Sequence, residues 1–165
     1  MKAPDSYVPL WCKTNYSFLE GASHPDELIS TCPDLGITRI GICDRDGVYG
    51  IVRAHVAAKQ HDMSIIIGSE LTLDDGGTVI LYPKDRTGYA NLCRLITTGR
   101  LRNEKGVCLV TWEEILGCGN GNVLLAAAGV EDLQENTFSA LRDVYADDVF
   151  LLLARHLEGS DRMNG

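Results

Sequence analysis

Ionisable and amide side chains follow three short apolar runs of this sequence. They fall into three groups: Lys13, Asn15 and Glu20; Asp44 and Arg45; and Glu70. Carboxylates bind divalent metal ions, and cations bind phosphate groups. If the three runs are parallel strands, their carboxyl ends meet at one edge of the sheet, where ligands bind. The pattern indicates a metal or phosphate site, with separate solvated loop charges as the alternative.

Apolar runs of strand length alternate with longer amphipathic stretches. Strands are expected over Tyr7–Cys12, Arg39–Cys43, Ser64–Gly68, Thr78–Tyr82, Val123–Ala128 and Val149–Ala154. Helices are expected over Pro25–Leu35, Val52–His61, Tyr89–Thr98, Thr111–Leu116 and Glu131–Tyr145. Pro33 is expected to end or kink the first of these helices, and Thr111 is expected to form a capping box with Glu114. A turn is expected at residues 74–77. This alternation is typical of an α/β fold with a parallel sheet. We expect about six parallel strands, in an open sheet or a closed barrel, because periodicity does not choose between them.

Composition places the chain among ordinary globular domains. It has 165 residues, of which 45% are hydrophobic and 23% charged, as expected for one domain. The net charge of −8 excludes binding of a phosphate backbone through the bulk field of the domain. A small basic cluster is the exception, and it consists of Arg94, Arg100, Arg102 and Lys105. By default we interpret these side chains as a helix end that is solvated by water.

The sequence has no segment that indicates a membrane or export. No run of 18 apolar residues is present, and Met1–Leu10 lacks the features of a secretory signal, so we expect a cytoplasmic protein without membrane contact. None of the six cysteines lies in a C-x-x-C pair, which argues against a zinc ribbon. Free, buried thiols are expected instead.

Longer motifs carry a family resemblance. In order, the chain contains YVPLWCKTNYSFLEGA, HPDEL, IGICDRDGVYGIVRAHVAAK, IIIGSELTL and DRTGYANLCRLIT. These motifs resemble the start of bacterial C-family DNA polymerases, which is the PHP (polymerase and histidinol phosphatase) domain. The similarity is greatest to the error-prone, damage-tolerant branch of the DNA polymerase III alpha subunit. It runs from about Tyr7 to Gly159.

The resemblance implies a fold. PHP domains form a distorted, TIM-like (βα)7 barrel, so we expect residues 1–159 to be the N-terminal portion of such a barrel and residues 160–165 a frayed tail. An incomplete barrel has an open edge, and an uncovered sheet edge favours pairing with other chains. We therefore expect the isolated chain to be marginally stable or to self-associate.

The resemblance also implies a set of ligand positions. Active PHP domains bind a metal cluster at the strand ends and cleave phosphoesters. The family motif His-x-His or His-x-Glu corresponds here to Lys13-Thr14-Asn15, and Thr-Asp-His corresponds to Cys43-Asp44-Arg45. Carboxylate positions of the family are kept at Glu20 and Glu70, whereas a histidine position near the fourth strand aligns with Thr78.

These departures remove metal ligands. A lysine ammonium has no lone pair for a metal ion, and an arginine stays protonated. Asn15 offers only a weak neutral oxygen. We therefore expect Lys13 and Arg45 to replace the metal ions electrostatically, in a vestigial pocket with no catalytic residue and no metal. The carboxylates of that pocket are Glu20, Asp44 and Glu70.

The expected function follows from the resemblance. The chain corresponds to the N-terminal PHP region of an error-prone polymerase used in DNA repair synthesis, and nothing in it matches the palm that performs nucleotidyl transfer. It is expected to be an inactive scaffold, with the remaining polymerase domains as partners and DNA contacted through them. Two alternatives stay open: a stand-alone phosphoesterase that uses zinc or manganese, and a non-catalytic interaction module or degenerate remnant.

Overall fold

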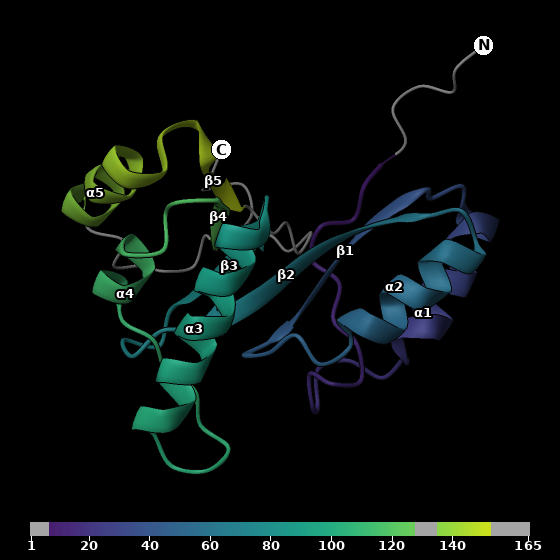
Figure 1. Ribbon diagram of the computed structural model, residues 1–165, viewed down its shortest axis with the longest axis horizontal. Helices are drawn as coiled ribbons and strands as arrows, with labels where there is room; N and C mark the ends of the chain where they lie inside the picture. The colour runs from purple at the N-terminus through teal and green to yellow at the C-terminus, as the bar shows by residue number, and fades with distance from the viewer. Residues whose placement is uncertain (1–6, 128–134, 153–165) are drawn as a thin grey trace, which may run out of the picture.

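The computed structural model describes residues 7–127 and 135–152. The strands are β1 (Arg39–Arg45), β2 (Ser64–Thr72), β3 (Thr78–Pro83), β4 (Asn122–Ala127) and β5 (Val149–Leu152). The α-helices are α1 (Pro25–Thr31), α2 (Ile51–Gln60), α3 (Arg86–Arg102), α4 (Trp112–Leu116) and α5 (Glu135–Tyr145), with short 3-10 helices at Pro33–Leu35 and Ala146–Asp148. In Figure 1, α1 and α2 lie beside β1 and β2, whereas α3, α4 and α5 lie at the other end, near β3–β5.

The parallel pair β1 and β2 positions the predicted site. Helix α2 is the crossover between the two strands, and its alanines pack with Ile29 and Ile42 in one apolar core. In the register of the pair, Arg45 lies opposite Glu70. Both strands run further than expected, so these two residues lie inside the strands rather than after them. The carboxyl ends of β1 and β2 therefore lie side by side.

The expectation that all strands are parallel is wrong at β3. Strand β3 pairs antiparallel with β2, and Thr78 lies opposite Thr72. The two strands are joined by the expected tight turn at residues 74–77, where Gly76 has a φ of 89°. Parallel neighbours need a crossover of about a dozen residues or more, so a turn this short permits only a hairpin.

The connection from β3 to β4 leaves the end of β3 and comes back to it. The chain runs out along α3 and returns to its starting end, where the Lys84 N–H donates to the Gly121 carbonyl at 2.8 Å. Strand β4 is therefore antiparallel to β3, and β5 is parallel to β4. The sheet has five strands in the order β1-β2-β3-β4-β5, not about six parallel ones. The barrel stays a prediction.

The expected strand Tyr7–Cys12 forms an extended segment rather than a regular strand. It lies parallel to β1, with one bridge between Cys12 and Ile42. The Gly41 N–H donates to the Pro9 carbonyl at 2.8 Å. Proline cannot donate to a ladder, which limits regular pairing there. The segment nevertheless brings the first group of predicted site residues to the end of β1.

Gly41 permits this close approach. A Cβ at Gly41 would lie 2.5 Å from the Leu10 carbonyl oxygen, which is closer than backbone atoms tolerate. We expect Gly41→Ala to lower the free energy of unfolding by about 2 kcal/mol, because the segment must move away from β1. Gly117→Ala is the control, since its added Cβ would lie 3.4 Å from the nearest atom. Urea unfolding measures both, and equal stability of the two variants would contradict the account.

Several local expectations are confirmed. Helix α1 ends at Thr31, just before Pro33, which lacks the N–H that a continuing helix needs. The Thr111 hydroxyl accepts the Glu114 N–H at 3.2 Å, and the Glu114 carboxylate accepts the Thr111 N–H at 2.9 Å, which forms the expected capping box. Helix α3 begins at Arg86, before the expected start at Tyr89, because the Asp85 side chain caps it by accepting the Gly88 N–H.

The cysteines are free, as expected. The buried ones are Cys32, Cys43 and Cys108. The partly buried ones are Cys12, Cys93 and Cys118. Burial raises the pKa of the Cys43 thiol to about 12, so this thiol is protonated at neutral pH. Protonated thiols in apolar surroundings are structural rather than reactive.

Some expectations fall on residues outside the described ranges. These are the helix start at Glu131, the strand ends at Ala128 and Ala154, and the tail at 160–165. Within the described ranges, no helix has both the length and the apolar character needed to cross a bilayer.

Candidate functional site

Four of the six predicted site residues form one ion-pair network at the carboxyl ends of β1 and β2. Lys13 Nζ donates to Glu70 at 2.7 Å and also donates to Glu20. Arg45 pairs with the second oxygen of Glu20. Lys13 therefore bridges two carboxylates, and Glu20 bridges two cations. The two positive and two negative charges balance.

Trp11 encloses one side of this network. Its indole N–H donates to the second oxygen of Glu70 at 2.5 Å. Lys13 Nζ lies 5.5 Å from the centre of the Trp11 ring, within the range of a cation–π contact. The Glu70 side chain is 7% exposed and that of Lys13 is 20% exposed, so the pair is largely shielded from water. Both Glu70 oxygens are bound by donors from the N-terminal segment.

Asp44 is the buried anchor of the loop that carries Lys13 and Glu20. Its side chain lies at the end of β1, and the residue is 1% exposed. The carboxylate accepts hydrogen bonds from the Thr14 backbone N–H at 2.7 Å, the Thr14 hydroxyl at 2.8 Å and the Ser17 hydroxyl at 2.7 Å. The Ser17 oxygen in turn accepts the Arg45 N–H at 3.0 Å. Asp44 thus fastens the loop to the strand.

Besides Asp44, two predicted positions stay outside the network. The Asn15 N–H donates to the Ser23 carbonyl at 2.9 Å, but the Asn15 side-chain oxygen has no hydrogen-bond partner among the described residues. Thr78 lies at the start of β3, opposite Thr72. In the described part of the chain, no ion pair or hydrogen bond joins Thr78 to the network.

Sequence reasoning missed three side chains that hold the site: Trp11, Thr14 and Ser17. The two hydroxyl residues alternate with predicted site residues, and this spacing in a polar loop is the only signal that could have identified them. Trp11 gave a weaker signal, because an aromatic residue in an apolar run is expected in the core. Its indole N–H is what makes it a partner for Glu70.

The surroundings of Lys13 favour its charged form. Burial lowers the pKa of Lys13, because an ammonium group loses hydration. Hydrogen bonds to Glu20 and Glu70, together with the charges of both carboxylates, outweigh burial. The pKa of Lys13 therefore lies above its ordinary value of 10.5. Lys13 is a stable cation over the whole neutral range.

This raised pKa predicts a loss of stability at alkaline pH. Because the folded pKa exceeds the unfolded one, the contribution of Lys13 is complete below about pH 10 and is lost as the pH rises through the folded pKa. The difference in unfolding free energy between wild type and Lys13→Met is expected to be constant from about pH 7 to pH 10 and to shrink above it. Urea titrations of both proteins measure it. A difference that grows above about pH 10 would contradict the prediction.

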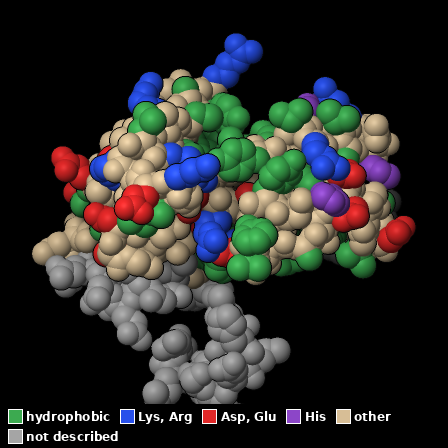
Figure 2. Space-filling view, turned by 90° about the horizontal axis from the view of Figure 1, so that it is seen from below, with side chains coloured by type: hydrophobic (Ala, Val, Ile, Leu, Met, Phe, Trp, Pro, Cys, Tyr) green, Lys and Arg blue, Asp and Glu red, His purple; other side chains and the backbone are tan. Residues whose placement is uncertain are grey.

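The basic cluster expected from the sequence is partly engaged within the fold. Arg100 donates to the Asp46 carbonyl at 2.7 Å, and Arg102 pairs with Glu114 at 2.8 Å. On the face shown in Figure 2, acidic and basic side chains are interspersed, with no continuous basic stripe. This arrangement offers little to a phosphate backbone.

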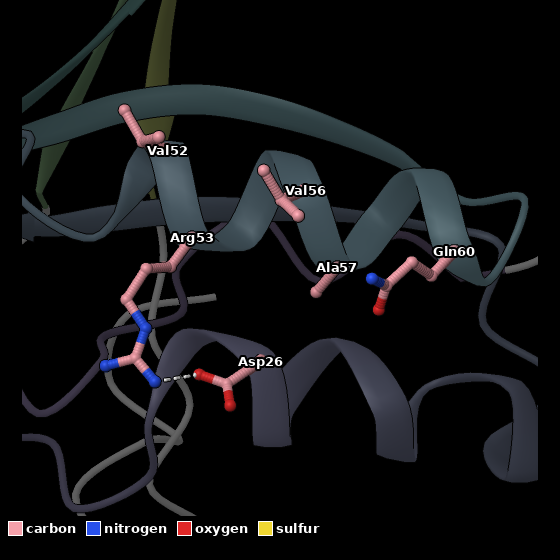
Figure 3. A pocket seen from close by; sticks show the side chains of 6 residues that line it. All are labelled: Asp26, Val52, Arg53, Val56, Ala57 and Gln60. Atoms are coloured by element: carbon pink, nitrogen blue, oxygen red, sulfur yellow. Dashed lines mark hydrogen bonds and ion pairs between the residues drawn. The ribbon is translucent and has the colours of Figure 1, made fainter.

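A groove of about 270 Å³ is lined by residues of α1 and α2 (Figure 3). Arg53 reaches from α2 to Asp26 on α1, with a distance of 2.6 Å between nitrogen and oxygen. The lining residues are Asp26, Val52, Arg53, Val56, Ala57 and Gln60. None of them is a predicted site residue, and an exposed ion pair between two helices carries no chemistry of its own.

Comparison with known proteins shows the family of this chain. A model of the PHP domain matches residues 10–151, which is most of the chain. The chain belongs to the PHP domain family. The family resemblance carried by the sequence motifs is thus confirmed.

The relatives of this PHP domain are polymerases. Error-prone DNA polymerase 1 of Agrobacterium fabrum is 37% identical over 164 residues, covering 99% of this chain and 15% of the polymerase. Error-prone DNA polymerase of Caulobacter vibrioides is 45% identical over 121 residues, covering 73% of this chain and 11% of the polymerase. The chain therefore spans about a seventh of the length of these curated relatives.

Two solved structures share the fold. A protein from Bifidobacterium adolescentis described as a metal-dependent phosphoesterase superposes with a TM-score of 0.68 at 15% identity, covering 98% of this chain and 82% of that one. An amidohydrolase from Chromobacterium violaceum superposes with a TM-score of 0.62 at 14% identity, covering 87% of this chain and 74% of that one. At these identities the likeness shows the mixed α/β fold alone.

The residues in this PHP domain do not fit a metal cluster. Lys13 Nζ donates to both Glu20 and Glu70, so a cation already occupies the space between the two carboxylates. Lysine and arginine have no lone pair to offer a metal. Across the described ranges, no three His, Cys, Asp or Glu side chains group in a way that could hold a metal ion.

Proposed function

We propose that this chain is the PHP region of an error-prone DNA polymerase and that it acts there as a structural scaffold without hydrolytic chemistry. The relatives support the first part, because they are error-prone DNA polymerases and match 99% of the chain in the case of Agrobacterium fabrum. The ion-pair network supports the second part. The polymerase activity would reside in the domains that these relatives have in addition.

The observation that carries the scaffold role is the position of Lys13 between two carboxylates. Glu20 and Glu70 would repel each other without a cation, and a metal ion would normally screen them. Here the ammonium of Lys13 supplies the positive charge, at 2.7 Å from Glu70. An ammonium group neutralises the carboxylates, but it cannot generate a metal-bound hydroxide that attacks phosphorus.

The same proposal covers partners and location. Because the domain has a net charge of −8, DNA would be contacted by other domains of the polymerase rather than by this one. The domain would pack against the polymerase body, and the whole enzyme would act in cytoplasmic DNA repair synthesis. In this role the site residues hold the fold, and none is catalytic.

The first test separates the scaffold from the stand-alone phosphoesterase. The purified chain is assayed for hydrolysis of p-nitrophenyl phosphate with added Zn²⁺ or Mn²⁺. The scaffold role predicts no metal-dependent turnover above that of Glu70→Gln, which lacks a carboxylate that the phosphoesterase would need as a ligand. Turnover that requires metal and disappears in Glu70→Gln would instead support the phosphoesterase.

The second test addresses the scaffold role directly. In error-prone DNA polymerase 1 of Agrobacterium fabrum, this chain replaces the matched region, and a second variant lacks that region. The temperature at which primer extension falls by half is expected to be higher with this chain than without it. Equal temperatures would show that the domain does not support the polymerase body.

A further inference from the structure

A tight turn beside the ion-pair network carries two exposed apolar side chains. Phe18 is 75% exposed and Leu19 is 90% exposed. We call these two residues the apolar turn. The rings of Tyr16 and Tyr49 lie next to each other nearby, with centroids 6.3 Å apart, and both are exposed. Contiguous exposed apolar side chains mark interaction sites on soluble proteins.

The fold holds the apolar turn rigidly from both sides. On one side, the Ser17 hydroxyl is bound to the buried Asp44, and the Ser17 carbonyl accepts the Glu20 N–H at 2.9 Å. On the other side, Glu20 is bound by Lys13 and Arg45. The vestigial pocket therefore serves as the base of the turn.

Leu19 has a strained backbone. Its φ is 66°, a value that favours glycine and costs an ordinary side chain free energy. The anchors on either side of the turn sustain this conformation, although the Leu19 side chain gains almost no burial within the domain. A strained backbone conformation persists where many surrounding contacts hold it in place, and such conformations are frequent at binding sites.

We infer that the apolar turn is the contact through which this domain docks onto the remaining polymerase domains; this inference rests on the proposed function. The relatives contain such a partner, because this chain covers 15% of the Agrobacterium fabrum polymerase and the rest of that protein lies outside the match. A rigid turn loses little conformational entropy on binding, and large apolar side chains that enter a pocket dominate interface energetics.

Charge favours the polymerase body over DNA as the occupant. The domain has a net charge of −8, so as a whole it would repel a phosphate backbone. A polymerase body needs basic residues to hold DNA, and basic residues beside the docking surface would attract an acidic domain. The partner surface should be an apolar pocket with a basic rim.

The test uses the chimeric Agrobacterium fabrum polymerase that contains this chain. The half-inactivation temperature of primer extension is measured for the chimera, for Phe18→Ser/Leu19→Ser, and for the control Leu35→Ser/Leu101→Ser, whose leucines are exposed elsewhere. The turn variant should lose about 5 °C, toward the value without the domain. The control should match the chimera.

Leu19→Gly separates docking from folding. Glycine accepts a φ of 66° without strain, so this variant should keep the hydrogen-exchange protection of β1 and β2. It should nevertheless lower the half-inactivation temperature, because the apolar anchor is gone. Lost protection in the two strands, with a parallel loss of activity, would assign Leu19 to folding and overturn the inference.

The outcomes distinguish the inference from the proposed function. If the turn variant matches the chimera while removal of the whole domain destabilises the polymerase, the docking inference fails and the scaffold role survives. If removal of the domain has no effect, the scaffold role fails as well. A turn variant that changes only self-association in light scattering, or only DNA affinity, would overturn the inference by assigning the turn to a second copy or to DNA.

Discussion

Replacing Asp44 with alanine is expected to lower the free energy of unfolding by about 4 kcal/mol, the largest effect among the site residues. The substitution leaves the N–H and hydroxyl of Thr14 and the hydroxyl of Ser17 without their acceptor. Each buried donor that loses its partner costs about 1–3 kcal/mol. Urea unfolding followed by tryptophan fluorescence measures the change.

Asp26→Ala is the matched control for this prediction. Asp26 also pairs with a partner from another element, Arg53, but both side chains are about half exposed. Exposed ion pairs contribute less than about 1 kcal/mol, so the control should remain close to wild type. If Asp44→Ala were no less stable than Asp26→Ala, Asp44 would not be the anchor of the loop.

Replacing Lys13 with methionine is expected to cost about 3 kcal/mol. Methionine keeps the apolar stem but leaves the shielded carboxylate of Glu70 beside Glu20 without the ammonium. Breaking a buried ion pair on one side costs about 3–5 kcal/mol, and the partial exposure of Lys13 places the effect at the lower end. Urea unfolding at neutral pH measures this effect.

Two further variants test the cause of that loss. Lys84→Met removes the cation of an exposed pair with Asp148, so its cost should stay below about 1 kcal/mol. Adding Glu70→Gln to Lys13→Met removes the uncompensated charge and should recover about half of the lost stability. A Lys13→Met variant as stable as wild type would show that the ammonium does not hold the carboxylates together.

The location of the site was predictable from the sequence because it depends on strand ends. Two parallel strands joined by a helix place their carboxyl ends together, and this brought Arg45 opposite Glu70 as the alternation of elements indicated. The family resemblance added the matching of Lys13 and Glu20 to ligand positions. The structure joins these four residues in one network.

The direction of β3 was also within reach of the sequence. The turn at residues 74–77 was identified, but its consequence for pairing was not: two strands joined by so few residues form a hairpin. The direction of β4 was not predictable in this way. It depends on the return of the chain to Gly121 after α3, and no local pattern records where a long connection ends.

The roles of Thr14 and Ser17 were out of reach for a different reason. Both hydroxyls bind Asp44, which lies 30 and 27 positions away along the chain. Hydrophobic periodicity locates elements but does not say which polar side chains meet across them. The exposure of Phe18 and Leu19 was likewise not predictable, because phenylalanine and leucine in an apolar run are expected in the core. Their exposure depends on contacts between residues that are distant in the sequence.

We propose that the ammonium of Lys13 stands where PHP domains of the active type hold metal, and the metal content of the purified chain decides this. The chain is purified, dialysed against a chelator, exposed to equimolar Zn²⁺ and Mn²⁺, desalted and analysed by elemental mass spectrometry. We expect far less than one metal ion per chain. A stoichiometric metal ion that survives desalting, and that is lost in Glu70→Gln, would contradict it.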